Sequence, residues 1–429
     1  MDNPRKIVLD ILHSITVEGA YSNLTIKQVL DTSRLSPADK ALVTEMVYGT
    51  LRYMITIDYI IDKFVKARRI SGKLKNILRL GIYQIMFMDK VPDFAACNES
   101  AKLARRFGGQ WSVNFVNAVL RNVIRNRKRI EYPRQDFTHY LMYKYSYPLW
   151  MVSMWMDQYG AQTAEKICQS GNERPDLTLR VNTLKANVDG VIRSLAREGI
   201  NCIMAEKWEN VIVVKEAKRS IHDTTAYKQG WFMAQDPGGV AVSKLLDPKP
   251  GHLVIDLCSA PGGKTCHMAE LMENKGNILA WDVHPHRLQL VKTNCRRMGV
   301  TNVEVRQHRA EVFDDALSSS ADRVLADVPC SGLGIIRRKP EIKLNRTCDD
   351  IAALTDIQRM IINTAGRYLK PGGAMVYSTC TINKKENEDI VRDFLKHNTG
   401  FKLEGEMVQP FPHIDGTDGF FMAKLIRKD

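Results

Sequence analysis

The sequence predicts an α/β protein in which an all-helical first part and a small α+β part precede a doubly wound, Rossmann-like parallel sheet. Apolar residues recur with the helical period from residue 1 to about 130. From about residue 236, strand-like runs alternate with helical ones, which is typical of a parallel sheet covered by helices. We therefore expect three domains, at residues 1–140, 141–235 and 236–429.

The composition indicates a globular protein with a polyanionic partner. The chain has 429 residues, of which 44% are apolar and 26% charged, and its formal net charge is +14. Such a basic excess favours nucleic acid or an anionic membrane surface as the partner. No apolar run approaches the ~20 residues that span a bilayer, and the N-terminus lacks a signal-peptide pattern. We expect a cytoplasmic protein.

Nine cysteines are scattered along the chain, and none of them lies at a zinc-ligand spacing. Their odd number, in a chain long enough to build its own cores, argues against a disulfide framework. We therefore expect free thiols and no metal site. Burial in a core is the ordinary environment of a cysteine, and we expect it for Cys97, Cys168 and Cys202.

The first part shows helix starts and apolar stripes. Ser36 and Pro37 are typical of an N-cap and of the first helical position after it. The stripes comprise Leu42, Val43, Met46 and Val47; Leu74, Ile77, Leu78 and Ile82; and Val113, Val116, Val119, Leu120 and Val123.

The polar faces of these helices carry three basic runs, at residues 66–75, 104–109 and 121–129. A single run of this kind is usually only a solvated face. Three runs on one small bundle, in a chain with a basic excess, favour phosphate binding. We therefore expect the first domain to bind nucleic acid.

The remaining strands can be placed by their apolar runs. In the middle domain they lie at 177–183 and 210–214, with an amphipathic helix between them that ends at Gly199. In the last domain they lie at 252–257, 276–282, 321–329 and 372–381, with a helix at 355–369. The middle domain carries no recognisable chemistry.

The first strand of the last domain is followed by the loop C-S-A-P-G-G-K-T, residues 258–265. Its small residues let a ligand approach the backbone closely before a helix begins. The spacing differs from that of a P-loop, which disfavours phosphate cradling. Asp282 ends the next strand, where an acid can bind a ribose diol. Taken alone, this pattern is equally typical of an ordinary strand-to-helix turn.

The stretch A-D-V-P-C-S-G-L-G, residues 326–334, places an acid, a proline and a cysteine at a third strand end. Asp327 would lie at the carboxyl edge of the sheet, where α/β enzymes bind ligands. Pro329 stops the strand and holds Cys330 on a stiff turn. Cys380 follows a fourth strand, in Y-S-T-C-T. Functional-looking loops at four strand ends of one sheet favour an active site over a chance pattern.

Together, D-L-C-S-A-P-G-G-K-T, A-D-V-P-C-S-G-L-G and Y-S-T-C-T resemble the motifs of the S-adenosylmethionine-dependent RNA cytosine-C5 methyltransferases. The first domain is similar to the NusB RNA-binding fold, which narrows the resemblance to bacterial enzymes that act on 16S rRNA. G-I-I-R-R-K-P-E-I-K and the ending D-G-F-F-M-A-K-L also resemble that family. The resemblance covers the whole chain and is strongest from residue 236 onward.

The resemblance implies a covalent mechanism. Carbon 5 of cytosine is a poor nucleophile until a thiolate adds to carbon 6. Cys380 would be that nucleophile, Cys330 would assist the elimination that frees the product, and Asp327 would hydrogen-bond the cytosine edge. Asp282 would hold the ribose of S-adenosylmethionine. The other residues expected at the cofactor are Cys258, Ser259, Ala260, Pro261, Gly262, Gly263, Lys264 and Asp327.

The chain departs from the family pattern at Arg309, which stands where members usually carry an acid near the adenine. Glu311 lies two residues later. Two alternatives remain open: a tRNA cytosine-C5 methyltransferase, and a non-catalytic RNA-binding or antitermination-type factor. Methylation of an exocyclic amine is least favoured, because it needs no thiol. We expect RNA as the partner, with no DNA and no membrane, and a monomer.

Overall fold

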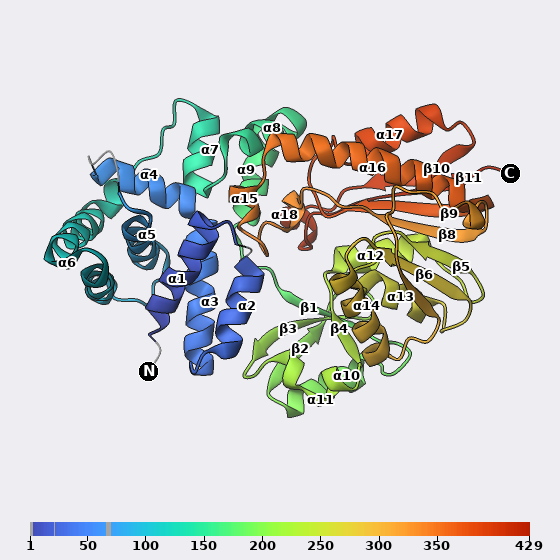
Figure 1. The fold of residues 1–429 in the computed structure, drawn as a ribbon, viewed down its shortest axis with the longest axis horizontal. Coiled ribbons are helices and arrows are strands. Elements are labelled where there is room, and N and C mark those ends of the chain that lie inside the picture. The colour runs from blue at the N-terminus through green and yellow to red at the C-terminus, as the bar shows by residue number, and fades with distance from the viewer. Residues whose placement is uncertain (1–2, 21, 66–69) are drawn as a thin grey trace. The chain divides into compact units, whose positions relative to one another are not determined.

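The computed structural model describes residues 3–20, 22–65 and 70–429, and the chain forms two compact units (Figure 1). The first unit contains Met1–Asn172 and Arg338–Asn345. The second contains Glu173–Arg337 and Arg346–Asp429. The three expected domains and their boundaries stay predictions, since the units divide the chain differently. Part of the basic run at 66–75 lies outside the described residues.

The described residues of the first unit form helices, as the sequence predicts up to about residue 130, and this helical unit also includes residues 137–170 and 342–345. They are α1 (Pro4–Val17), α2 (Ser22–Thr32), α3 (Pro37–Arg52), α4 (Met54–Phe64), α5 (Gly72–Phe87), α6 (Asp93–Asn126), η1 (Arg127–Arg129), α7 (Phe137–Tyr145), α8 (Leu149–Tyr159), α9 (Ala161–Ser170) and α15 (Ile342–Asn345). The predicted start of α3 is confirmed, because the Ser36 side chain accepts a hydrogen bond from the Asp39 N–H and Pro37 opens the helix.

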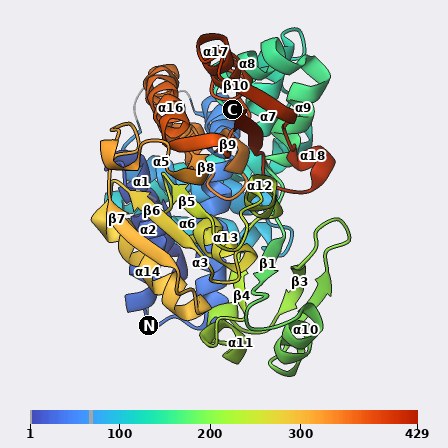
Figure 2. The ribbon, with the colours of Figure 1, turned by 90° about the vertical axis from the view of Figure 1, so that its right-hand side faces the viewer.

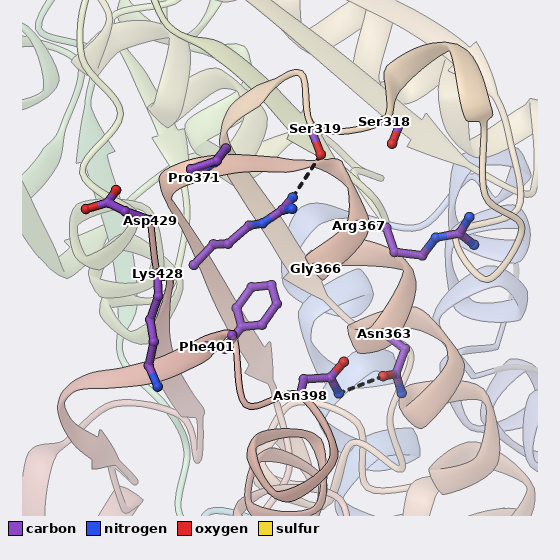
Figure 3. Close-up of a pocket in the computed structure, with 12 residues that line it drawn as sticks. Ser318, Ser319, Asn363, Gly366, Arg367, Pro371, Asn398, Phe401, Lys428 and Asp429 are labelled. Atoms are coloured by element: carbon purple, nitrogen blue, oxygen red, sulfur yellow. Dashed lines mark hydrogen bonds between the residues drawn. The ribbon is translucent and has the colours of Figure 1, made fainter.

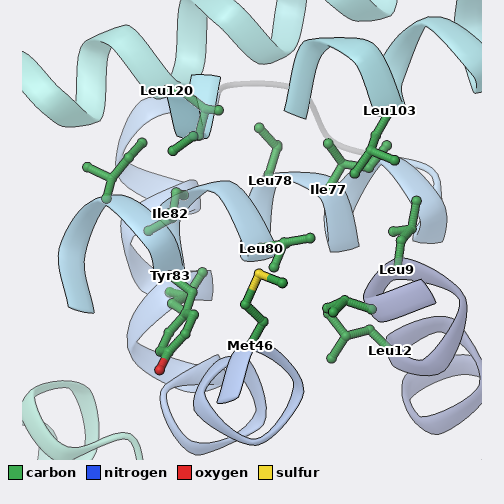
Figure 4. Close-up of a cluster of buried hydrophobic side chains, with 14 of the residues drawn as sticks. Leu9, Leu12, Met46, Ile77, Leu78, Leu80, Ile82, Tyr83, Leu103 and Leu120 are labelled. Carbon is green, nitrogen blue, oxygen red and sulfur yellow. The ribbon is translucent and has the colours of Figure 1, made fainter. Parts of the chain in front are cut away.

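The core of this unit packs α1, α3, α5 and α6 against one another (Figure 4). Leu12, Met46, Leu78 and Leu120 contribute fully buried side chains from these four helices. Burial of such a side chain stabilises the fold by about 1.5–3 kcal/mol. The predicted stripes therefore face the core, with Leu42 only partly buried.

Helix α6 folds back on itself. A straight helix of its 34 residues would separate its ends by about 50 Å. Instead, the Arg127 guanidinium lies 3.3 Å from the Asp93 carboxylate. The backbone leaves the helical conformation at Gly108 and Gly109, the latter with φ of 58°. The two halves of α6 thus form a hairpin whose tip is this pair of glycines.

The segment Arg338–Asn345 inserts a lysine into the first unit. Lys343 is 2% exposed, and burial lowers its pKa. Its Nζ donates hydrogen bonds to the carbonyl oxygens of Arg52 (3.1 Å) and Tyr145 (3.3 Å) and to Asn172 Oδ1 (2.6 Å). A residue from the last third of the chain therefore completes the interior of the helical unit.

The second unit begins with a four-stranded sheet in the order β2-β3-β1-β4. Its elements are β1 (Leu177–Val181), α10 (Val188–Arg197), β2 (Ile200–Met204), β3 (Val211–Ala217), η2 (Ile221–Asp223), α11 (Thr225–Lys228) and β4 (Phe232–Ala234). The paired strands run antiparallel. Gly199, just beyond α10, has φ of 78°, which favours glycine at a helix end.

The larger sheet of this unit has seven strands in the order β10-β11-β9-β8-β5-β6-β7. Its strands are β5 (Leu253–Asp256), β6 (Asn277–Asp282), β7 (Val303–Gln307), β8 (Ala321–Asp327), β9 (Leu369–Thr379), β10 (Phe401–Val408) and β11 (Phe421–Arg427). Strands β5 to β9 are parallel, and β11 runs antiparallel to both β9 and β10. The predicted doubly wound parallel core is confirmed, with an antiparallel edge that the sequence did not reveal.

Helices cover both faces of this sheet (Figures 1 and 2). The helices are α12 (Pro237–Leu246), α13 (Gly263–Leu271), α14 (Pro285–Met298), η3 (Asp315–Leu317), η4 (Leu333–Ile335), α16 (Cys348–Tyr368), α17 (Glu388–His397) and α18 (Pro412–Asp415). Val242, Met268 and Val291 pack from α12–α14 on one face, and Ile361 and Phe394 from α16 and α17 on the other. None of the described helices is long and apolar enough to cross a membrane.

Candidate active site

The four strand ends marked by the sequence lie side by side, because their strands follow the order β9-β8-β5-β6. These strands are parallel, so their carboxyl ends meet at one edge of the sheet. Cys380 follows β9, Asp327 ends β8 and Asp282 ends β6, while the loop at 258–263 leaves β5. The structure thus brings the predicted site residues to a single edge.

The two cysteines of the edge are in direct contact. Cys330 Sγ and Cys380 Sγ lie 3.3 Å apart, and the Cys380 N–H donates to Cys330 Sγ at 3.4 Å. The hydrogen bond with Cys380, together with burial, raises the pKa of Cys330 well above its ordinary value. Cys330 therefore keeps its proton and can donate its S–H to Cys380 Sγ, which stabilises a thiolate on Cys380.

Asp327 is held by a lysine and a serine. Its Oδ2 lies 2.7 Å from Lys264 Nζ, and its Oδ1 accepts a hydrogen bond of 2.8 Å from Ser378 Oγ. Burial acts to lower the pKa of Lys264, but the charge of Asp327 holds that pKa above its ordinary value. The pair therefore presents an ammonium and a carboxylate at the sheet edge.

A buried carboxylate fixes the loop that carries Cys330. Glu386 accepts hydrogen bonds from the Ser331 N–H (2.8 Å) and the Ser331 hydroxyl (2.5 Å). Asn383 Nδ2 (2.9 Å) and Gln358 Nε2 (3.1 Å) donate to the same carboxylate. Glu386 is fully buried, so these donors compensate its desolvation. It connects the loop after β8 to the loop after β9, in which Cys380 lies.

A cavity of about 180 Å³ opens at this edge. Its walls include Asp256, Cys258, Lys264, Asp327 and Phe420. Burial raises the pKa of Asp256 to about 7, and the Thr265 hydroxyl donates to its Oδ2 at 2.7 Å. Burial likewise raises the pKa of Cys258, so its thiol stays neutral. The cavity places one easily protonated carboxyl beside the Lys264–Asp327 pair.

The loop between β5 and α13 lies against the two following elements. Ser259 Oγ donates to the Trp281 carbonyl oxygen at 2.9 Å, and Arg287 Nη2 donates to the Ala260 carbonyl oxygen at 3.0 Å. Gly262 has φ of 99°, and a Cβ there would meet Val291 Cα at 3.2 Å. Only glycine fits this close backbone approach without strain.

The Asp282 carboxylate is almost fully buried, with 4% of its side chain exposed. It accepts a hydrogen bond from the His284 N–H at 3.0 Å and lies 3.4 Å from Arg287 Nη1. A carboxylate has about four acceptor positions, so it can also bind hydroxyl groups. Arg309, in contrast, is 67% exposed and pairs with Glu311 at 2.6 Å. Arg309 thus forms an ion pair with Glu311, the acid two residues after it in the sequence.

Three residues of the edge were missed by sequence reasoning. Asp256 was recognised only as part of a strand, although an acid at a strand end is itself a signal. Phe420 lies beside Lys264 in space, 5.4 Å from Nζ to the ring centroid, but far from it in the sequence. Glu386 gave no signal, because its role depends on donors from two other loops.

Among the residues that the structure describes, no cysteine outside the loops of this edge lines the cavity. Cys97 and Cys168 are buried, as expected, whereas Cys202 is partly exposed. Buried Cys266 and Cys295 have their Sγ atoms 3.9 Å apart. Within the described part of the chain, no group of three or more His, Cys, Asp and Glu side chains could hold a metal ion.

A larger cavity, of about 480 Å³, lies at the opposite end of the strands (Figure 3). Ser319, Pro371 and Lys428 line it, and Arg427 Nη1 donates to Ser319 Oγ at 2.9 Å. None of the predicted site residues reaches this cavity. Because ligands of parallel sheets bind at the carboxyl ends of the strands, we assign the site to the smaller cavity.

Three family profiles match consecutive parts of the chain. Residues 2–125 match the NusB family, and residues 147–221 match a ferredoxin-like domain of RsmF/B-like methyltransferases. Residues 243–426 match the profile described as 16S rRNA methyltransferase RsmB/F. The chain is therefore similar to these families from its second residue almost to its last.

Curated relatives align over the full length. A probable ribosomal RNA small subunit methyltransferase B of Bacillus subtilis is 36% identical, over 99% of this chain and 98% of the relative. Its namesake in Synechocystis is 31% identical, over 99% of both chains. The crystal structure of PH0851 is 28% identical, with a TM-score of 0.82 over 99% of both chains. The structure of NSun6 from Pyrococcus horikoshii with SFG is 26% identical, with a TM-score of 0.61 over 66% of this chain.

Proposed function

Because the chain belongs to the family of ribosomal RNA small subunit methyltransferases B, we propose that it methylates carbon 5 of a cytosine in 16S rRNA. The observation that carries the proposal is the contact of two thiols, Cys330 and Cys380, beside the Lys264–Asp327 pair. Methyl transfer to an amine or a hydroxyl needs no thiol, whereas transfer to carbon 5 of a pyrimidine needs a nucleophile at carbon 6.

S-adenosylmethionine is the cofactor of this family, and the residues of the edge fit it. When bound, it supplies an electrophilic methyl group on a sulfonium sulfur. The acid of Asp282 is placed to accept hydrogen bonds from ribose hydroxyls. The loop Cys258–Lys264 has a close backbone approach at Gly262. The chain departs from the family's usual acid near the adenine, because Arg309 stands there and pairs with Glu311.

Cys380 begins the reaction. Its thiolate forms a bond to carbon 6 of the cytosine. The π electrons of the carbon 5–carbon 6 double bond shift onto carbon 5 and toward the ring nitrogen, which makes carbon 5 nucleophilic. Asp327 accepts a hydrogen bond from the exocyclic amino group at the cytosine edge and so orients the ring for attack. Lys264, 2.7 Å from Asp327, holds that carboxylate in position.

Cys330 serves the last step. After carbon 5 has gained the methyl group, the proton on carbon 5 is lost to water and the bond between Cys380 Sγ and carbon 6 breaks. The departing sulfur carries the electron pair and becomes a thiolate again. Cys330 keeps its proton, so its S–H stabilises that thiolate at a distance of 3.3 Å. The target base must leave its stack to reach both thiols, which is easiest in a single-stranded loop.

The proposal is tested by incubating the full-length protein with unmodified 16S rRNA, tRNA and S-adenosylmethionine carrying a labelled methyl group. We expect label in 16S rRNA, recovered as 5-methylcytidine after digestion, and a single protected cytosine by bisulfite mapping. Label in tRNA alone would identify a tRNA enzyme. Absence of transfer to either RNA, with RNA binding retained, would identify a non-catalytic RNA-binding factor.

We further propose that the protein is a cytoplasmic monomer with neither DNA nor a membrane as its partner. The net charge of +14 supports a polyanionic substrate. Light scattering of the purified chain and competition of labelled RNA with DNA and with anionic vesicles test these points. A dimer, or equal competition by DNA, would contradict them.

A further inference from the structure

The tip of the α6 hairpin carries two aromatic side chains that face solvent. Phe107 is 41% exposed and Trp111 is 67% exposed, and they flank the break at Gly108 and Gly109. The Trp111 ring stacks on Phe115, one turn further along, with centroids 5.4 Å apart and planes inclined by 3°. Trp111 thus stacks on a neighbouring ring of its own helix while most of its side chain remains accessible to solvent. Such paired exposure of large aromatic rings indicates a binding surface.

The surroundings of these rings are strongly basic. Arg105 and Arg106 are exposed, and neither forms an ion pair with any residue that the structure describes. Lys73, at the start of α5, has its Nζ 5.1 Å from the centroid of the Phe107 ring. Residues 102–115, which surround the tip, include three basic residues and no acid. The potential at the tip therefore attracts an anion.

We propose that the tip of the α6 hairpin binds an unpaired stretch of RNA. Bases stack on Trp111 and Phe107, while Arg105, Arg106 and Lys73 contact the phosphates. Every base has a face that can stack on an aromatic ring, so this contact tolerates many sequences. In a duplex the faces are covered by neighbouring bases, so the tip distinguishes unpaired from paired RNA.

RNA suits this surface better than a protein does. A protein that covered the two rings would also have to desolvate Arg105 and Arg106, at a cost unless acids paired with them. A single strand offers both complements at once, because each nucleotide joins a flat base to a phosphate. The inference rests on the proposed function for RNA as the substrate and adds a second contact site on the helical unit.

The first test measures binding of the full-length protein to a fluorescent RNA of about 12 nucleotides, as a single strand and as a duplex. We expect Trp111→Ala to weaken binding of the single strand about tenfold and to leave duplex binding within about twofold. Trp111→Phe keeps an aromatic face and should stay within about threefold of the wild type. The control is Phe94→Ala, an aromatic residue 77% exposed at the base of the hairpin, in the first half of α6, which should change neither affinity.

The second test separates stacking from charge. Arg105→Gln combined with Arg106→Gln should lower the slope of log affinity against log salt by about 1.4, because each single-strand phosphate contact contributes about 0.7. Trp111→Ala should leave that slope unchanged, since the ring carries no charge. Far-ultraviolet circular dichroism and the melting temperature should match the wild type, because these side chains are exposed.

Three results would overturn the inference. The first is that Trp111→Ala binds the single strand as tightly as the wild type does. The second is that Phe94→Ala loses as much single-strand affinity as Trp111→Ala, and the third is that Trp111→Ala loses as much affinity for the duplex as for the single strand. Loss of capture of a ribosomal protein with unchanged RNA affinity would assign the tip to a protein partner instead. Methyl transfer by the wild type reports the proposed function separately. If the wild type methylates RNA while Trp111→Ala binds the single strand normally, only the present inference fails; if the wild type binds no RNA, both fail.

Discussion

Cys330 Sγ and Cys380 Sγ lie 3.3 Å apart although 50 residues separate them in the chain. The parallel register of β8 with β9 pairs Asp327 with Ser378, and each cysteine follows its strand end within three residues. A slip of one residue would displace one thiol by about 3.3 Å and turn its neighbours to the other face of the sheet. We propose different roles for the two thiols, because the raised pKa of Cys330 keeps the proton on that sulfur.

This difference predicts opposite phenotypes for the two cysteines. Cys380→Ala should abolish methyl transfer and leave no covalent RNA, because no bond to carbon 6 can form. Cys330→Ala should still allow attack and methyl transfer but should slow elimination. Its RNA should remain attached and migrate slowly on a denaturing gel. The double variant should lose that band.

The control for these cysteines is Cys348→Ala, which removes an exposed thiol at the start of α16. It should methylate RNA at the wild-type rate and trap none. If Cys380→Ala traps RNA and Cys330→Ala does not, the roles are reversed. If neither variant traps RNA and both keep activity, the thiols are only part of the core.

Asp282→Asn should weaken the binding of S-adenosylmethionine about a hundredfold. The reason is the loss of a charged acceptor for two hydroxyl groups, since a hydrogen bond to a charged group contributes about 1.5–3 kcal/mol. Isothermal titration calorimetry measures the dissociation constant directly. Asp315→Asn, at a carboxylate 94% exposed, is the matched control and should bind normally. If Asp282→Asn and Asp315→Asn bind S-adenosylmethionine equally tightly, the ribose does not contact Asp282.

Asp256 should make the stability of the protein depend on pH. Its folded-state pKa of about 7 lies above its ordinary value of 3.8, so the folded protein holds a proton that the unfolded chain releases between these pH values. Stability from this group is therefore present below pH 4 and is lost as pH rises to 7. The loss is at most about 4 kcal/mol, at about 1.36 kcal/mol per pKa unit.

Asp256→Asn removes this dependence, because an amide does not titrate in that range. Urea unfolding at pH 5 and pH 8 should show a smaller loss of stability for the variant than for the wild type. Other carboxylates contribute equally to both proteins, so the difference between the two curves isolates Asp256. Identical curves would mean that Asp256 is ionised throughout.

Glu386→Gln should lower the rate of methyl transfer at least about tenfold with an unchanged cofactor affinity. Glutamine keeps the size of the side chain, but its NH₂ group cannot accept the bonds from Ser331 and Asn383. A loop displaced by about 1 Å costs about a hundredfold in rate when it carries a reacting group. The readout is kcat, and the control is Asp389→Asn, an exposed acid after the same loop. A change in KM alone would contradict a positioning role for Glu386.

Lys343→Met should destabilise the helical unit by about 2–6 kcal/mol. Two acceptors, the Arg52 carbonyl oxygen and Asn172 Oδ1, lose their donor, and each unsatisfied buried group costs about 1–3 kcal/mol. The Tyr145 carbonyl oxygen keeps a bond from Asn172 Nδ2. Hydrogen exchange of residues 137–172 measures the effect, with exposed Lys339→Met as the control. Equal protection in both variants would show that Lys343 is dispensable.

The sequence revealed the parts of the molecule whose signals are local. The helical stripes, the cap at Ser36 and the alternation of strands with helices each depend on neighbouring residues, and the structure confirms them. The resemblance to the RNA methyltransferases is confirmed by full-length relatives. The motifs at the four strand ends were recognisable because ligand binding at a parallel sheet uses short loops. Their individual roles stay predictions.

Features that depend on distant parts of the chain could not be predicted. Glu386 meets Ser331 only because two loops from different strands converge, and such a contact has no sequence pattern. The basic run at 104–109 was recognised, but the reversal of α6 at Gly108 and Gly109 was not, although paired glycines inside a helix signal a break. The return of residues 338–345 to the helical unit had no signal.

That return has a consequence for synthesis on the ribosome. The helical unit emerges first, but Asn172 receives its hydrogen bond from a residue 171 positions later in the chain. At about 5–20 residues per second, roughly 10–30 s pass before Lys343 is made. Throughout that interval the nascent unit has unmatched acceptors in its interior, so it should be a target for chaperones. Proteolysis of chains arrested before and after Lys343 should show protection of residues 137–172 only in the longer chains.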